Sequence, residues 1–342
     1  MYGKAIVNIR LLFCGWCGRA AGRNMGNLLK VFLGYVVMLT IVLFSKGGKR
    51  KDNPMKIAIT TDSNSGITAG EAEKLGIFLI PMPVMIDTET YLEGVNIQTE
   101  QLFEAMEQER SVSSSQPAPG SILQLWNSIF EHGYDAIVHI PMTSGLSGSC
   151  QNAAMLAEDF DGRVYVVDNH RISVTQKGSV LEAKHMVDAG CTPEEIKAYL
   201  EASGFQASIY LTVADLKYLQ RGGRLSSSAA LLGTLLNIKP ILSIQGYQID
   251  VFSKVRGLKA CEKKMIEAVQ SDISARFADV PMEKLRIEAG GTQRNQEDRD
   301  SWKSAVQAAF PGMEIGYVTL PCSIASHVGP DCVAMAVYAS EY

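Results

Sequence analysis

Cysteine is scarce in this sequence and irregularly placed. The 342 residues include seven cysteines, an odd number, and only Cys14-x-x-Cys17 has the spacing of a metal or redox motif. No second pair accompanies it, so we expect neither a metal site nor a catalytic disulfide. Scattered, unpaired thiols also exclude a secreted disulfide scaffold. The sequence therefore predicts a cytoplasmic protein with reduced cysteines.

Motifs for nucleotide and nucleic acid binding are missing as well. The chain has neither the G-x-x-x-x-G-K-[ST] phosphate loop nor the G-x-G-x-x-G dinucleotide motif, so we expect no nucleotide cofactor. Residues 1–54 hold nine Lys or Arg against one acid, a charge of +8, and the whole chain carries −4, which leaves −12 for residues 55–342. An acidic body without a basic stripe argues against nucleic acid as a partner.

The basic residues 1–54 form an extension that also contains the apolar run Leu28–Phe44. This run is short for a membrane span, which needs roughly 17–25 residues, and no A-x-A cleavage pattern follows it. Three interpretations compete: a marginal membrane anchor, an uncleaved signal, and a translated upstream region with the working start at Met55. We favour the third, because Met55 opens directly on a predicted strand; membrane contact through residues 28–44 stays open as an alternative.

Residues 55–208 alternate strand and helix signals. Continuous apolar runs such as Ala136–Ile140 alternate with helices whose starts are marked by the capping boxes Thr68-x-x-Glu71 and Thr192-Pro-Glu-Glu195. Such alternation predicts a doubly wound α/β lobe with a parallel sheet, which binds ligands beyond the carboxyl ends of its strands. From residue 209 to 342 the alternation loosens, and we expect a second, α+β lobe.

Three hydroxyl-rich loops at predicted strand ends or helix starts are candidate binding elements. They are Thr60–Ser63, Ser113–Gly120 and Thr143–Ser149. Free backbone amides and hydroxyls ahead of a helix bind oxygen anions well, although each loop is also explained as an ordinary helix cap. The candidate site residues from these loops are Thr61, Ser114, Ser115, Ser147 and Gly148.

The stretch from Ile209 to Arg256 contains three segments of different character: a strand, a turn with two arginines, and an apolar segment. A predicted strand leads to the turn Arg221-Gly-Gly-Arg224, and the turn is followed by Ala229–Leu236, which is small and apolar on nearly every face. Such a segment suits a fully buried helix or the wall of an apolar cavity.

The order of these pieces closely resembles the DegV family of fatty-acid-binding proteins, over about residue 55 to the C-terminus. The resemblance rests on Asp215-Leu216, Tyr218-Leu219, Arg221-Gly-Gly-Arg224, Leu232-Gly233, Leu236, Ile238-Lys-Pro-Ile-Leu242 and Lys254-Val-Arg-Gly257. It implies two lobes with an apolar tunnel between them, a long-chain fatty acid as the bound ligand, and presentation of that ligand to a separate kinase that makes an acyl phosphate.

The same resemblance implies the residues that bind the head group. The family's Thr-Ser-Gln-Pro loop places its carboxylate-binding serine at Ser115, with Ser114 in place of the threonine. The family's His-x-Gly-Pro-Gly segment matches His327-Val-Gly-Pro330, but Asp331 replaces the last glycine. Either Asp331 points away from the carboxylate or the head-group site is altered.

We assign Arg221 and Arg224 to docking of the kinase and not to the ligand. Two arginines on a glycine turn point outward more readily than inward, because a buried guanidinium needs a paired carboxylate. In DegV proteins this turn lies beside the tunnel mouth, where a kinase must approach.

A serine hydrolase is the competing interpretation. Residues 145–149 nearly spell the G-x-S-x-G nucleophile elbow, with Ser147 as nucleophile and His327 downstream as base. Asp168, next to His170, is the candidate acid, although that pair is also explained as a strand end. The final glycine of the elbow is missing, so we favour the binding protein.

Overall fold

The computed structural model describes residues 55–225 and 238–341. Two predicted features therefore lie outside the described residues: the apolar run Leu28–Phe44 and the small apolar segment Ala229–Leu236. Within the described ranges, no helix combines the length and the apolarity that crossing a membrane requires.

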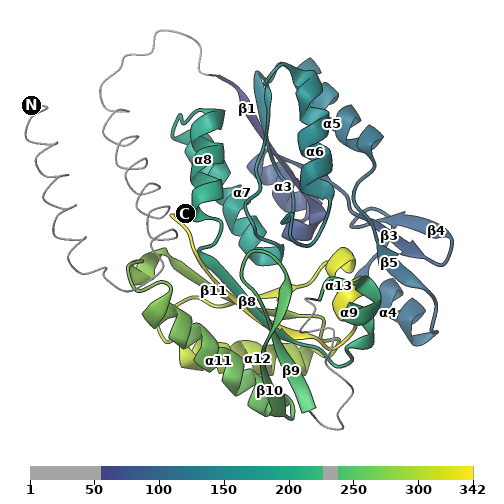
Figure 1. Ribbon diagram of the computed structural model, residues 1–342, viewed down its shortest axis with the longest axis vertical. Coiled ribbons are helices and arrows are strands. Elements are labelled where there is room, and N and C mark those ends of the chain that lie inside the picture. The colour runs from purple at the N-terminus through teal and green to yellow at the C-terminus, as the bar shows by residue number, and fades with distance from the viewer. Residues whose placement is uncertain (1–54, 226–237, 342) are drawn as a thin grey trace, which may run out of the picture. The chain divides into compact units, whose positions relative to one another are not determined.

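The first lobe is built on a parallel sheet of four strands in the order β2-β1-β6-β7. The strands are β1 (Ile57–Asp62), β2 (Ile77–Ile80), β6 (Ala136–Ile140) and β7 (Val164–Val166). Helices cover both faces, with α3 (Ala69–Leu75), α7 (Ser173–Asp188) and α8 (Pro193–Ser203) on one, and α5 (Pro119–Glu131) and α6 (Ser149–Ala157) on the other (Figure 1). The predicted doubly wound lobe is confirmed.

Local sequence explains these elements. Within β1, Ile57 and Ile59 pack under α7 and α8 while Ala58 faces α5, as the two-residue period of a strand requires. Both predicted capping boxes are present, at Thr68 for α3 and at Thr192 for α8.

The chain runs from β1 to β2 on one side and returns to β6 on the other, so the crevice at the carboxyl ends of β1 and β6 is the switch point where such folds bind ligands.

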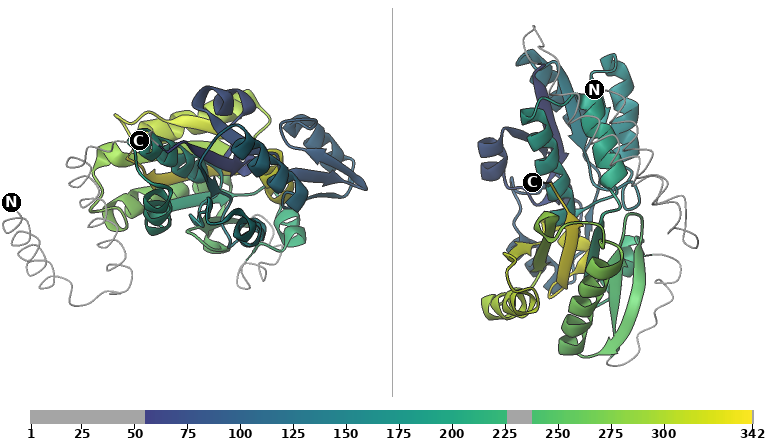
Figure 2. Two further views of the ribbon diagram at one scale, coloured as in Figure 1. Left: turned by 90° about the horizontal axis from the view of Figure 1, so that it is seen from above. Right: turned by 90° about the vertical axis from the view of Figure 1, so that its left-hand side faces the viewer.

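The second lobe is a mixed sheet of six strands in the order β10-β9-β8-β13-β11-β12. The strands are β8 (Ala207–Thr212), β9 (Ile238–Ile244), β10 (Ile249–Arg256), β11 (Leu285–Gly291), β12 (Gly316–Thr319) and β13 (Val333–Ala339). The helices α11 (Leu258–Ala275) and α12 (Gln296–Ala309) lie on the side of this sheet turned away from α7 (Figures 1 and 2). The expected α+β lobe is present, but β8 begins at Ala207 and so crosses the predicted boundary between residues 208 and 209.

A small third sheet, which the sequence does not reveal, flanks the first lobe. It consists of β3 (Pro83–Ile86) between β4 (Glu89–Leu92) and β5 (Val112–Ser114). It packs with α4 (Thr99–Glu107) and α13 (Cys322–Val328), and α13 in turn packs against α9 (Lys217–Gly222) (Figure 1). This arrangement brings the loop after β5, the turn after α9 and the end of α13 together.

Candidate functional site

An apolar cavity lies between the face of the six-stranded sheet and the loops at the carboxyl ends of β1 and β6. The space between its lining atoms is about 990 Å³, a figure that includes open solvent. Its floor is Ile209, Leu211, Ile244, Ala334 and Ala336, and its roof includes Met82, Met142, Leu146, Ile172 and Val174. Residues on both sides of position 209 therefore line one cavity, as predicted for the tunnel.

One end of the cavity carries a serine and histidine pair. Ser114, the last residue of β5, shares a hydrogen bond with His327 of α13, with 2.9 Å between Oγ and Nε2. Ser115 follows and also lines the cavity, while its backbone N–H donates to the carbonyl of Pro83 at 3.1 Å. Three of the predicted head-group residues, Ser114, Ser115 and His327, are thus brought together from elements about 210 positions apart in the sequence.

His327 is held in its neutral form at neutral pH. Burial, and after it the nearby Arg224 guanidinium, lowers the pKa of His327 to about 4. A neutral imidazole can donate one N–H to a ligand oxygen without the desolvation cost of a buried cation. The ring fits only because residue 222 is glycine: a Cβ there would lie 2.4 Å from His327 Nδ1.

A second, polar pocket shares three residues with this end of the cavity: Ser114, Arg224 and His327. Its other basic residues are Arg110, Lys217 and Arg221. Arg110 is paired with Asp87 and Lys217 with Asp215, whereas no ion pair of Arg221 or Arg224 is recorded within the described residues. The serine and histidine pair therefore separates an apolar space from a basic one.

This geometry changes the assignment of Arg224. Its side chain lines the apolar cavity as well as the polar pocket, and its Nε donates to the Leu146 carbonyl at 3.4 Å. Arg224 therefore lies at the end of the apolar cavity as well as in the polar pocket, because the turn after α9 folds back toward the loop that holds Leu146. Arg221 lines only the polar pocket.

Two other candidates do not line the cavity. Thr61 is fully buried, with its hydroxyl donating to the Ile140 carbonyl at 2.7 Å, so it ties β1 to β6 instead. Gly148 caps α6, and a Cβ at that position would lie 3.1 Å from Oε1 of Gln116, which does line the cavity. A loop's composition does not fix which of its residues face inward, and these two do not line the cavity.

Ser147 lines the cavity, but its partners are not those of a nucleophile. Its Oγ lies 2.8 Å from Ser149 Oγ and accepts the Ser149 backbone N–H at 3.1 Å, which makes a local serine turn ahead of α6. Within the described ranges, no hydrogen bond joins Ser147 to His327, whose Nε2 is engaged by Ser114. Asp168, the candidate acid, lies beside His170 and accepts the Ser144 N–H at 3.2 Å. The triad of the hydrolase interpretation does not assemble.

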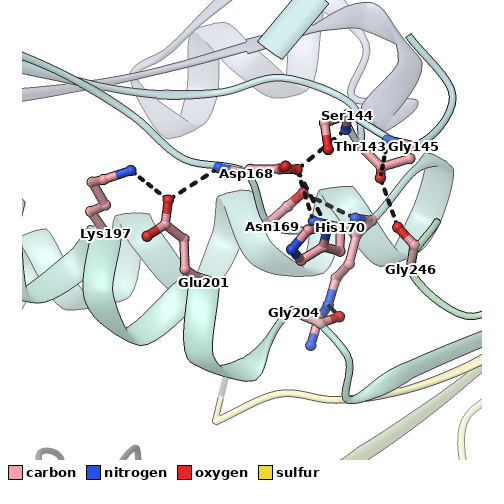
Figure 3. Close-up of polar contacts among 11 residues, drawn as sticks. Thr143, Ser144, Gly145, Asp168, Asn169, His170, Lys197, Glu201, Gly204 and Gly246 are labelled. Carbon is pink, nitrogen blue, oxygen red and sulfur yellow. Dashed lines mark hydrogen bonds and ion pairs between the residues drawn. The ribbon is translucent and has the colours of Figure 1, made fainter. Parts of the chain in front are cut away.

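The loop that contains Ser147 is held by the tip of the β9–β10 hairpin (Figure 3). Thr143 Oγ1 donates to the Gly246 carbonyl at 2.9 Å and accepts the Gly145 N–H at 3.1 Å. The backbones approach so closely that a Cβ at Gly145 would lie 2.1 Å from the Tyr247 carbonyl oxygen. One wall of the cavity is therefore fixed by contacts between the two lobes.

Comparison with known proteins decides the family. Residues 56–340 match the family model described as "Uncharacterised protein, DegV family". The chain belongs to the DegV family. A DegV domain-containing protein of Listeria innocua is 33% identical over 282 residues, which cover 82% of this chain and 97% of that protein.

Solved structures of DegV proteins share the fold. A DegV family protein from Thermus thermophilus, described by its fatty acid binding, superimposes with a TM-score of 0.75 at 26% identity, covering 83% of this chain and 100% of that one. DegV of Bacillus subtilis, described as a fatty acid binding protein, gives a TM-score of 0.74 at 29% identity, covering 84% and 100%. The two-lobed α/β architecture is thus that of the DegV family.

Asp331, which replaces the last glycine of the DegV pattern, does not line the cavity. Asp331 has a left-handed backbone with φ of 57°, which explains why glycine suits this position. Its side chain is exposed and its Oδ2 lies 3.7 Å from an Arg294 nitrogen. Of the two alternatives left open by the sequence, the structure supports the one in which Asp331 points away from the head group.

Five polar residues that line this DegV cavity are not among the predicted site residues: Asn64, Gln116, Ser173, Glu288 and Ser323. Asn64 follows β1 within the short 3-10 helix η1 (Ser63–Ser65), and Ser173 is the first residue of α7; both line the cavity and both are buried. Asn64 is one residue beyond the first hydroxyl-rich loop, so inclusion of the whole turn after the strand would have found it. No local signal marks Ser173.

Proposed function

We propose that this protein binds one long-chain fatty acid, with the acyl chain in the apolar cavity and the carboxylate at the Ser114, Ser115 and His327 end. The observation that carries the proposal is the cavity's composition: an apolar space that ends at a hydrogen-bonded serine and histidine beside an arginine. Each buried methylene contributes roughly 0.8 kcal/mol, so about fifteen supply on the order of 10 kcal/mol before association costs.

The polar end has the chemistry to orient a carboxylate. Hydroxyl groups of Ser114 and Ser115 and a neutral His327 are donors, and Arg224 supplies a positive charge without being buried. The relatives from Thermus thermophilus and Bacillus subtilis, described as binding fatty acids, support the ligand class.

We further propose that the bound acid is presented to a separate kinase for acyl phosphate formation. The carboxylate end adjoins the polar pocket, so a partner can reach it from outside while the acyl chain stays buried. The sequence contains neither common phosphate-binding motif, which fits ATP being bound by the partner. Arg221, exposed on the rim of that pocket, suits contact with an acidic surface of such a partner.

Mass spectrometry of lipid released from the purified full-length chain tests the binding proposal. We expect a long-chain fatty acid in near-stoichiometric amount, or stoichiometric uptake of added palmitate or oleate by a delipidated sample. Protein that carries no lipid and takes up neither acid would overturn the proposal.

Replacement of Arg221 by alanine tests the role in presentation. We expect Arg221→Ala to bind fatty acid as the wild type does and to slow phosphorylation of the bound acid by a cognate kinase, more strongly at low salt than at high salt. Arg256→Ala, which removes the same charge from exposed β10, is the matched control and should have no effect. Equal phosphorylation of all three proteins would disprove the docking role.

A further inference from the structure

Two polar side chains in the apolar cavity wall have no hydrogen-bond partner. Asn64 is 2% exposed and Ser173 is 5% exposed, and both line the cavity. Among the described residues, neither Asn64 Nδ2 nor Ser173 Oγ has a partner. Buried donors are nearly always satisfied in native proteins, so two in the wall of one cavity point to an oxygen on the ligand.

These two residues belong to the lining of the apolar cavity. Neither lines the polar pocket that shares Ser114, Arg224 and His327. Asn64 lies in η1, which packs against α7, and Ser173 begins that helix. The surrounding wall is apolar, with Ile172 and Val174 on either side of Ser173. We define Asn64 and Ser173 as the inner polar site.

The carboxyl groups near Asn64 indicate whether a charged or a neutral ligand oxygen can bind at the inner polar site. Asp62 accepts a hydrogen bond from the Asn64 backbone, and burial raises the pKa of Asp62 to about 6. Ser63, the other neighbour of Asn64, donates to the buried carboxyl of Glu93. Two buried carboxyls next to Asn64 disfavour a second anion there, whereas a neutral hydroxyl or carbonyl oxygen carries no such penalty.

We propose that the inner polar site binds a hydroxyl or carbonyl oxygen on the acyl chain, so that the protein prefers an oxygenated long-chain fatty acid to the plain acid of the same length. This inference rests on the proposed function. Asn64 Nδ2 donates to the oxygen, and the Ser173 hydroxyl either donates to it or accepts a ligand O–H. A site built to hydrogen-bond an oxygen discriminates against the analogue that lacks it.

Competition binding with stearate and a series of positional hydroxystearates tests the inference on the full-length protein. We expect at least one hydroxystearate to bind roughly tenfold more tightly than stearate. Asn64→Leu, similar in size but apolar, should remove this preference. Ser173→Ala, a smaller change, should reduce the preference in the same direction.

Asn152→Leu is the matched control, because Asn152 Nδ2 is also buried without a partner but the residue does not line the cavity. This variant should keep the preference. If stearate binds and no isomer is preferred, or if the preference survives both Asn64→Leu and Ser173→Ala, the inference is wrong and the proposed function stands. If neither stearate nor any hydroxystearate binds, the proposed function itself fails.

Discussion

Replacement of Ala336 by phenylalanine is expected to lower the affinity for long-chain fatty acids at least a hundredfold. Ala336 lies on the cavity floor in β13, opposite Ile209 of β8, and is 2% exposed. A phenyl ring there occupies space that about four methylenes of the ligand would fill. At roughly 0.8 kcal/mol per methylene the loss is about 3 kcal/mol, more than a hundredfold in affinity.

The contrast with the head group makes this prediction specific. His327→Ala removes one donor to the carboxylate and should cost about 1.5 kcal/mol, roughly tenfold in affinity. Titration calorimetry with palmitate should therefore rank Ala336→Phe well below His327→Ala. Ala275→Phe, the same change at an exposed position of α11, should bind as the wild type does.

Retained affinity in Ala336→Phe would place the ligand outside this cavity. Thermal unfolding of Ala336→Phe is the control, because a misfolded variant would also lose affinity for the ligand. The cavity gives the ring room, so we expect its melting temperature to lie close to that of the wild type or above it.

The first lobe could be predicted because its signals are local. Capping boxes at Thr68 and Thr192 and the apolar run of β6 each lie within a few residues of the element they define. A parallel sheet with both faces covered needs only continuous apolar strands between helices, and these are visible in sequence.

The second lobe depends on pairings between distant residues. β8 lies between β9 and β13, and its partner Ala336 is more than a hundred positions from Ile209. No local pattern shows which strands pair, and a shift of one residue would exchange the cavity face of a strand with its opposite face. The short strands β4, β5 and β12 escaped prediction for the same reason.

Side-chain direction limits prediction of the site. Ser114, Ser115 and His327 follow from the family motifs. The sequence does not show that the Arg224 side chain turns toward the Leu146 carbonyl, or that the Thr61 hydroxyl donates to the Ile140 carbonyl of the neighbouring strand. Asn64 and Ser173 are distinguished by burial combined with the lack of a hydrogen-bond partner for Asn64 Nδ2 and Ser173 Oγ among the described residues, and neither property can be read from the sequence.

Acidification should destabilise the protein through His139, a buried residue of β6. Its Nδ1 lies 2.8 Å from Thr60 Oγ1 and its ring packs edge-on against Trp126. Burial lowers the pKa of His139 from 6.5 to about 3. The unfolded chain therefore takes up a proton below pH 6.5 that the folded protein refuses, and the free energy of unfolding falls as the pH falls.

Two other buried groups titrate in the same range with opposite signs. The lowered pKa of His327, about 4, adds a further loss of stability as the pH falls. The raised pKa of Asp62, about 6, does the reverse: the folded protein binds a proton between about pH 6 and 3.8 that the unfolded chain does not, so stability rises as the pH falls. The total pH dependence therefore does not isolate His139, and only a comparison with a variant does.

His139→Phe keeps the ring beside Trp126 and removes the titrating group. Urea unfolding at pH 7 and pH 4 should show that the wild type loses roughly 3 kcal/mol more stability than this variant over that interval, since 2.5 pH units at 1.36 kcal/mol each separate the two. At pH 7 the variant should be the less stable protein, because Thr60 loses its partner. His132→Phe, at an exposed position, should follow the wild type at both pH values. Parallel losses in the wild type and His139→Phe would mean that His139 is protonated in the folded protein near pH 6, and that its burial does not control acid stability.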